Sequence, residues 1–153
     1  MHEQLEIGDK NEYIHPICSG IDVHKKMLFA AIHIYDKNRD QVRYITARFT
    51  TFPKGLQEMV NWHIVNGCSE ICMESTGQYW HPVFDAFEEA GLHPVIAHPK
   101  YTTPIKGKNS DPADAKWFAK SYAGGHVVPS LFLLKRSGLL DQLSVTVLRF
   151  TIR

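Results

Sequence analysis

The sequence lacks the features that would point directly to a partner or a compartment. Lysine and arginine number 17 against 16 for aspartate and glutamate, so net charge argues neither for nor against a nucleic-acid partner. The three cysteines, Cys18, Cys68 and Cys72, have no framework spacing, which excludes a disulfide-rich domain and favours a reduced, cytoplasmic protein. No apolar run reaches membrane-spanning length, and the polar start "MHEQLEIGDKNEY" is not a signal peptide. We therefore expect a soluble chain with one ordinary globular domain.

The apolar residues change between period two and period 3.6 along the chain, which predicts a mixed α/β domain. Strands are expected over 16–23, 27–35, 42–50, 70–74 and 93–97, and helices within 52–67, over 79–91 and from Asp111 onward. In the first helix one apolar face is expected to hold Leu56, Met59, Val60, Ile64 and Val65. The order β-β-β-α-β-α-β-α combines three antiparallel strands with right-handed β-α-β crossovers, which is the order of the ribonuclease H-like (RuvC-like) fold.

Four acidic residues occupy positions that could meet at one point. Asp22, in "GIDVHKK", interrupts a strand that is otherwise apolar, where a carboxylate is costly unless it is paired or binds a cation. Glu74 ends the strand in "MESTG", at the carboxyl end where ligands of open α/β sheets bind. Asp111 and Asp114 open the last helix in "SDPADAKW". Carboxylate oxygens that converge favour magnesium or manganese.

Ordinary structural roles also account for some of these acids when each is taken alone. Asp111 is a natural N-cap before Pro112, and Asp114 is a favourable first-turn acid, so structural and catalytic roles are equally supported there. Glu74 alone is better explained as an ordinary strand-end acid. Asp22 is harder to dismiss, because its neighbours in the strand point to the opposite face. We expect His24 to point away from Asp22 and to have a structural role.

Three motifs together resemble a known family. "GIDVHKK", "MESTGQYW" and "KNSDPADAKWFA" are similar, in this order and spacing, to the N-terminal RuvC-like domain of the IS110-family transposases, which carries a DEDD carboxylate set. By motif position the four acids correspond to Asp22, Glu74, Asp111 and Asp114. The resemblance implies DNA transposition by phosphoryl transfer with two Mg²⁺ or Mn²⁺ ions, roughly 3.5–4 Å apart in such sites. It also implies a guide RNA, homo-oligomers, and a C-terminal domain with a serine nucleophile.

Further residues are candidates for contact with nucleic acid. Five lysines flank the acidic motifs and could neutralise phosphates, although single lysines are more often solvated surface: Lys25, Lys26, Lys100, Lys106 and Lys108. Tyr79 and Trp80 could stack on a base, although an aromatic pair at the start of a helix is more often core.

The end of the chain departs from the family. We expect an N-terminal extension over 1–14, the RuvC-like domain over 15–129 and an atypical tail over 130–153. Back-translation of the tail with a shift of one nucleotide permits a continuation that begins "FIPPKEIR" and is closer to the family. We hypothesise a frameshift near Ser130, which fails if the alternate frame of the gene contains no longer homologous reading frame.

Three functions remain open at this point. In the first, the chain is the catalytic N-terminal domain of a transposase, in a truncated copy without the serine domain. Alternatively, it is a non-catalytic remnant that binds nucleic acid. A stand-alone RuvC-like nuclease that resolves DNA junctions would share the carboxylate site but not the "MESTGQYW" motif.

Overall fold

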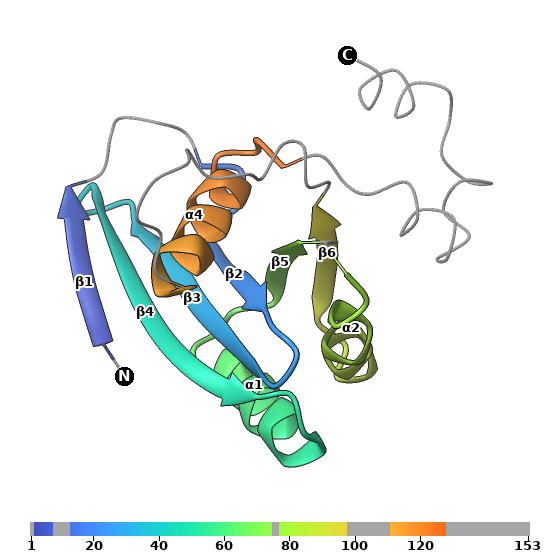
Figure 1. Cartoon of the computed structure of the whole chain (residues 1–153). Helices are drawn as coiled ribbons and strands as arrows, with labels where there is room; N and C mark the ends of the chain where they lie inside the picture. Colours follow the sequence, from blue (N-terminus) through green and yellow to red (C-terminus); the bar gives the residue numbers. More distant parts are fainter. Residues whose placement is uncertain (1, 8–12, 75–76, 98–110, 128–153) are drawn as a thin grey trace.

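The computed structural model describes residues 2–7, 13–74, 77–97 and 111–127, with the backbone alone for 2–7 and 111–113. Nine helices and strands occur in these ranges (Figure 1). They are β1 (His2–Ile7), β2 (Ile17–Val23), β3 (Met27–Asp36), β4 (Gln41–Thr50), α1 (Pro53–Val65), β5 (Glu70–Glu74), α2 (Trp80–Glu89), β6 (His93–Ala97) and α4 (Asp111–Ala123). The strands and helices expected from periodicity are all present within one or two residues of their expected bounds. Among the described residues no helix is long and apolar enough to cross a membrane.

The six strands form one mixed sheet in the order β1-β4-β3-β2-β5-β6. β1, β4, β3 and β2 pair antiparallel, while β2, β5 and β6 pair parallel. β2 is therefore the central strand, between the hairpin strands and the crossover strands. β1 was not expected from the sequence, because only Leu5 and Ile7 alternate with polar residues there, which is too short a pattern to indicate a strand. It adds an edge strand beside β4 and lies within the expected N-terminal extension.

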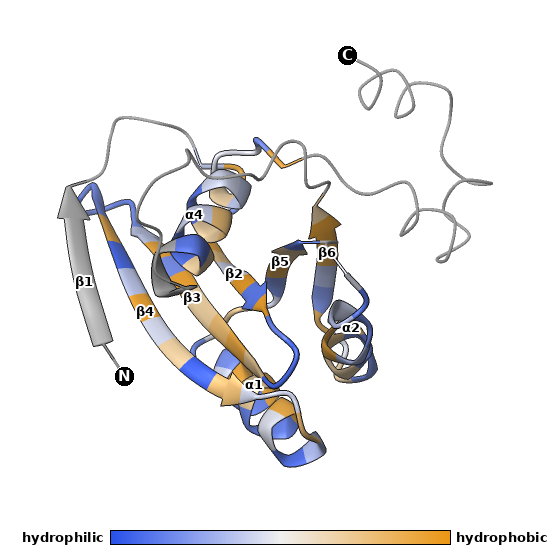
Figure 2. Cartoon of the chain, viewed as in Figure 1, coloured by the Kyte–Doolittle hydropathy of each residue, from blue (hydrophilic) through white to orange (hydrophobic). Residues whose placement is uncertain are grey.

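Helices cover both faces of the sheet (Figure 1). Alternate residues of the central strands pack on different helices, as expected for side chains that alternate between the faces. Ile21 and Ile71 belong to a core cluster with Met59 of α1 and Phe87 of α2. Figure 2 shows the connection between β2 and β3 as hydrophilic, so the central strand passes from a buried core directly into a polar turn.

The opposite face of the central strands packs on α4. There Cys18 and Cys72 form a second cluster with Tyr122 of that helix. The Cys18 thiol donates a hydrogen bond to the Ala119 carbonyl over 3.3 Å. Burial raises the pKa of Cys72 to about 12, and the charge of Glu74 adds to this effect. This thiol therefore stays protonated and acts as a small apolar group in the core.

The buried face of α1 differs from the expected one at its C-terminal end. Met59, Val60 and His63 are buried, whereas Ile64 and Val65 are 52% and 84% exposed. The last two were wrongly assigned to the core face, because at about 100° per residue they lie far from the line through Met59 and His63. A buried histidine thus completes a face that apolar spacing alone predicted to be aliphatic.

His63 is held in the core by two hydrogen bonds. Its Nδ1 donates to the Met59 carbonyl and its Nε2 accepts from the Ser19 hydroxyl of β2, both over 2.8 Å. This assigns the neutral tautomer with the proton on Nδ1. Burial lowers the pKa of His63 from 6.5 to about 4, against the opposing effect of the bond to the Met59 carbonyl. The folded protein therefore resists protonation of this ring.

Acidification should destabilise the fold through His63. Between pH 6.5 and pH 4 the unfolded chain binds a proton at this residue and the folded chain does not, so the free energy of unfolding falls as pH falls. Above pH 6.5 protonation of His63 costs the folded chain no stability. As the pH falls from 6.5 to 4, the free energy of unfolding decreases by roughly 3 kcal/mol through this residue. In urea unfolding across this pH range, the free energy of unfolding should fall less steeply with decreasing pH for His63→Gln than for the exposed control His93→Gln. Equal slopes for the two variants would contradict this assignment.

Gly20 allows α4 to lie directly on β2. A Cβ at this position would clash with two backbone atoms of the helix, Ala115 O and Ala119 N, and would lie 2.8 Å from Phe118 Cβ. Backbone atoms cannot rotate away as a flexible side chain can. The closeness of helix and strand at the centre of the sheet therefore depends on the absence of a side chain at Gly20.

Gly20→Ala should weaken the fold by forcing α4 away from the sheet. Overpacking of this kind costs typically about 1–3 kcal/mol, measurable as a lower urea midpoint. The matched control is Gly124→Ala, just beyond α4, where the nearest atoms belong to the exposed ring of His126, which can turn aside. If both variants lose equal stability, the contact at Gly20 is not the constraint inferred here.

Candidate active site

The candidate site lies where β2 and β5 end. These neighbouring strands are parallel, with Gly20 opposite Cys72 and Ile21 opposite Met73. Asp22 and Glu74 are the next residue on each strand, so their backbones reach the same edge of the sheet. Both belong to the alternation that faces α4, because Gly20 and Cys72, two residues earlier, pack on that side.

The N-terminal end of α4 reaches the same region. Cys18 contacts Ala119, and Gly20 lies against Ala115 and Ala119, so the helix runs antiparallel to β2. Further along β2, Asp22 is therefore level with the beginning of the helix. The helix begins at Asp111, as expected, and Oδ1 of Asp114 in its first turn is shielded from solvent. The side chain of Asp111 lies outside the described residues.

The described carboxylates share one end of one face but do not form a closed ligand group. Among the residues whose side chains the structure describes, no three histidine, cysteine, aspartate or glutamate side chains are close enough to hold a metal ion. The chemistry of the donors nevertheless fits a hard cation, because Asp22, Glu74 and Asp114 offer only carboxylate oxygens. Carboxylates at close range repel one another unless a cation is shared, so a bound cation would be needed to draw these side chains together.

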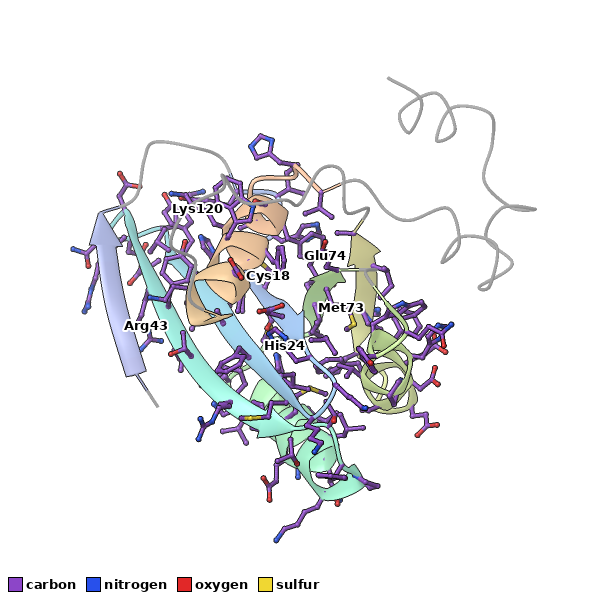
Figure 3. All side chains as sticks on the ribbon, in the orientation of Figure 1. Cys18, His24, Arg43, Met73, Glu74 and Lys120 are labelled. Atoms are coloured by element: carbon purple, nitrogen blue, oxygen red, sulfur yellow. The ribbon has the colours of Figure 1, made fainter. Side chains whose placement is uncertain are left out.

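His24 is part of the site, contrary to the sequence-based expectation. Its Nε2 donates a hydrogen bond to Oδ2 of Asp22 over 3.0 Å, with the His24 side chain 47% exposed and that of Asp22 14% exposed. The expectation was wrong because residues two apart in an extended chain lie on the same side. The His24 ring also packs edge-on against Phe29, with 6.1 Å between ring centroids. Figure 3 labels Glu74, the last residue of β5, and His24, which directly follows β2.

Two of the five candidate lysines lie in the described part of the chain. Lys25 and Lys26 are exposed in the turn between β2 and β3, next to the Asp22–His24 pair. Thr51 anchors this turn: its hydroxyl donates to the Lys25 carbonyl over 2.9 Å and its N–H to the Lys26 carbonyl over 3.1 Å. The three remaining candidates lie outside the described residues, namely Lys100, Lys106 and Lys108.

The aromatic candidates separate into one exposed and one buried residue. Tyr79 is 48% exposed, but Trp80 is only 4% exposed. Trp80 lies in the core cluster beside Phe84 and stacks on the His81 ring, with 3.7 Å between ring centroids. Of the two roles considered for Trp80, burial supports the one in the core, because its ring already packs in the interior and is not available to a base. A tryptophan at the start of an amphipathic helix more often has this role.

Comparison with solved structures identifies similar folds. T. thermophilus RuvC in complex with a Holliday junction substrate superposes with a TM-score of 0.55 at 13% identity, covering 74% of this chain and 99% of that one. The fowlpox virus resolvase in complex with a Holliday junction gives a TM-score of 0.42 at 14% identity, over 61% and 64% of the two chains. The similarity to RuvC confirms the ribonuclease H-like fold.

Comparison with sequence families identifies the chain more closely. No curated protein matches the sequence significantly. The family model of IS110-type DEDD transposases, described as a transposase, matches residues 19–134 and thus most of the chain. The match includes every motif on which the resemblance was based, and such a family implies phosphoryl transfer on DNA. The chain belongs to the IS110 family of DEDD transposases.

Proposed function

We propose that this chain is the catalytic DEDD domain of its transposase and performs cation-dependent phosphoryl transfer on DNA. The observation that carries the proposal is the common edge of β2 and β5, where Asp22 and Glu74 follow the paired residues Ile21 and Met73 beneath the N-terminal end of α4. Asp111 and Asp114 complete the carboxylate set on that helix. The match over 19–134 supports a domain close to the proposed range of 15–129.

Each carboxylate has a role that its position supports. Asp22, on the central strand, is oriented by the hydrogen bond from His24, and Glu74 extends the acidic edge along β5. Asp114 approaches from the helix above. Mg²⁺ or Mn²⁺ ions bound there would activate the attacking oxygen and stabilise the leaving oxygen. The protein supplies the remaining contribution, which is a rigid sheet edge that holds these ligands in position.

Two alternatives are separated from this proposal by measurement. A non-catalytic remnant would bind DNA or cations without cleaving DNA. A junction-resolving nuclease would cleave four-way junctions as its main substrate, but the likeness to RuvC at 13% identity concerns the fold and does not favour that activity. A guide RNA and self-association remain expectations from the family.

DNA cleavage tests the proposed function directly. The full chain should cleave a branched DNA in the presence of Mg²⁺, and Asp22→Ala should reduce cleavage by at least about 10²-fold, because loss of a ligand disrupts charge stabilisation in the transition state. Glu58→Gln is a suitable control, since it removes an exposed carboxylate on α1, on the opposite face. Cleavage that persists in Asp22→Ala would overturn the catalytic assignment. Cation binding without cleavage by the wild type would favour the remnant.

Cation binding should be visible as thermal stability. Ligands that bind only the folded chain stabilise it by mass action, by about 2.7 kcal/mol at a concentration 100 times the dissociation constant. Millimolar Mg²⁺ or Mn²⁺ should therefore raise the melting temperature of the wild type and of Glu58→Gln, but not of Asp22→Asn. Identical wild-type melting curves with and without the cations would refute the metal site.

A further inference from the structure

A row of three residues leads from the acidic edge across the hairpin strands. In the antiparallel register, Asp22 of β2 lies opposite Phe29 of β3, and Phe29 lies opposite Arg48 of β4. Residues directly opposite each other in antiparallel strands project on the same face. Arg48 is therefore on the face of the sheet that carries Asp22, two strands away from it.

A second contact independently places this side of β4. The Lys116 ammonium of α4 lies over the Tyr44 ring, 5.9 Å from its centroid. Tyr44 and Arg48 are four residues apart on one strand, so they share a face. The arginine thus lies on the α4 side of the sheet, as the pairing through Phe29 also requires.

Arg48 has no structural role that would account for its charge. It is exposed, and within the described part of the chain its guanidinium forms no ion pair and no hydrogen bond with a side chain. The other arginine at an exposed position of this hairpin, Arg39, has its Nε 3.7 Å from Oδ2 of Asp36. An unpaired guanidinium on the same face of the sheet as Asp22 is suited to bind an anion that also approaches that carboxylate.

The spacing of the row fits a nucleic-acid strand. Two strand spacings place the Cα atoms of Asp22 and Arg48 roughly 10 Å apart. Successive phosphates rise by roughly 3.4 Å along the axis of duplex DNA, and the winding of the strand around that axis places them farther apart than this rise, so Arg48 is one or two phosphates away from the carboxylates. Phe29, partly exposed between them, provides an apolar surface for a sugar or a base. The turn with Lys25 and Lys26 connects β2 and β3 close to Asp22 and Phe29, the first two residues of this row.

We propose that Arg48 binds a backbone phosphate one or two nucleotides from the one that reacts, so that the DNA strand runs across β3 from the carboxylates to β4. This rests on the proposed function and adds to it a direction for the strand and a positioning residue that the family motifs do not include. The planar guanidinium offers two parallel hydrogen bonds to one phosphate, a geometry that a lysine in this place would not reproduce.

The test compares two variants with the same change in charge. Arg48→Gln removes the proposed phosphate contact, whereas Arg39→Gln removes an arginine at the far end of the same hairpin, in the turn between β3 and β4. Binding of the full chain to a fluorescent branched DNA is measured by anisotropy in EDTA at several KCl concentrations. Arg48→Gln should bind about tenfold more weakly, and its slope of log affinity against log salt should fall by about 0.7–0.9. Arg39→Gln should retain the affinity and slope of the wild type.

The outcomes separate this inference from the function on which it rests. If the wild type binds and cleaves the DNA while both variants bind equally well, the assignment of Arg48 is overturned and the proposed function remains. Loss of cleavage in Arg48→Gln with unchanged affinity and salt slope also overturns it, since a phosphate contact must contribute to binding. If the wild type neither binds nor cleaves branched DNA, the proposed function itself is wrong.

Discussion

The close contact between α4 and β2 is the constraint on which the rest of the site depends. Because Gly20 has no side chain, the backbone of the helix lies directly on the central strand at Ala115 and Ala119. That contact sets the position of the helix along the strand and thereby brings its first turn level with Asp22. The acids of β2 and α4 come from positions about 90 residues apart in sequence, and hydrophobic packing alone would leave the helix free to slide. Steric complementarity at one glycine fixes its place more sharply than apolar area can.

In the proposed function, local charge, and not net charge, provides the surface for DNA. With 17 basic and 16 acidic residues the whole chain has almost no net charge. The charges are nevertheless arranged locally: Asp22 and Glu74 lie at the ends of β2 and β5, while Lys25, Lys26 and Arg48 are exposed on the neighbouring turn and on β4. Binding of DNA would then rely on a few short-range contacts, which makes the orientation of the strand, and not steering from a distance, the main contribution of these cations.

Periodicity predicted most of the fold because each strand and helix buries one apolar face, and the family motifs supplied the four candidate acids, whose role in the reaction stays a prediction. The failures have local physical causes. β1 is a largely polar edge strand, so only Leu5 and Ile7 mark the alternation of apolar residues there. Ile64 and Val65 are apolar but do not belong to the face of α1 that packs on the sheet. His63 is buried on that face instead. Arg48 could not have been recognised from sequence, because its relation to Asp22 arises from the register of two strand pairs and not from spacing along the chain.

The alternation of side chains along β2 explains how a carboxylate is tolerated in a central strand. Ser19 and Ile21 face α1 and α2, where the hydroxyl is satisfied by His63 in an interior without charge. Cys18, Gly20 and Asp22 face α4. The polar residue is the last of the three, at the end of the strand, where α4 begins and covers the sheet less. Asp22 is the last of these three positions, still 14% exposed and hydrogen-bonded by His24. One residue earlier, the same carboxylate would face the apolar core, where its desolvation would be uncompensated. The acid therefore stands where the fold can support its charge and a substrate can still approach it.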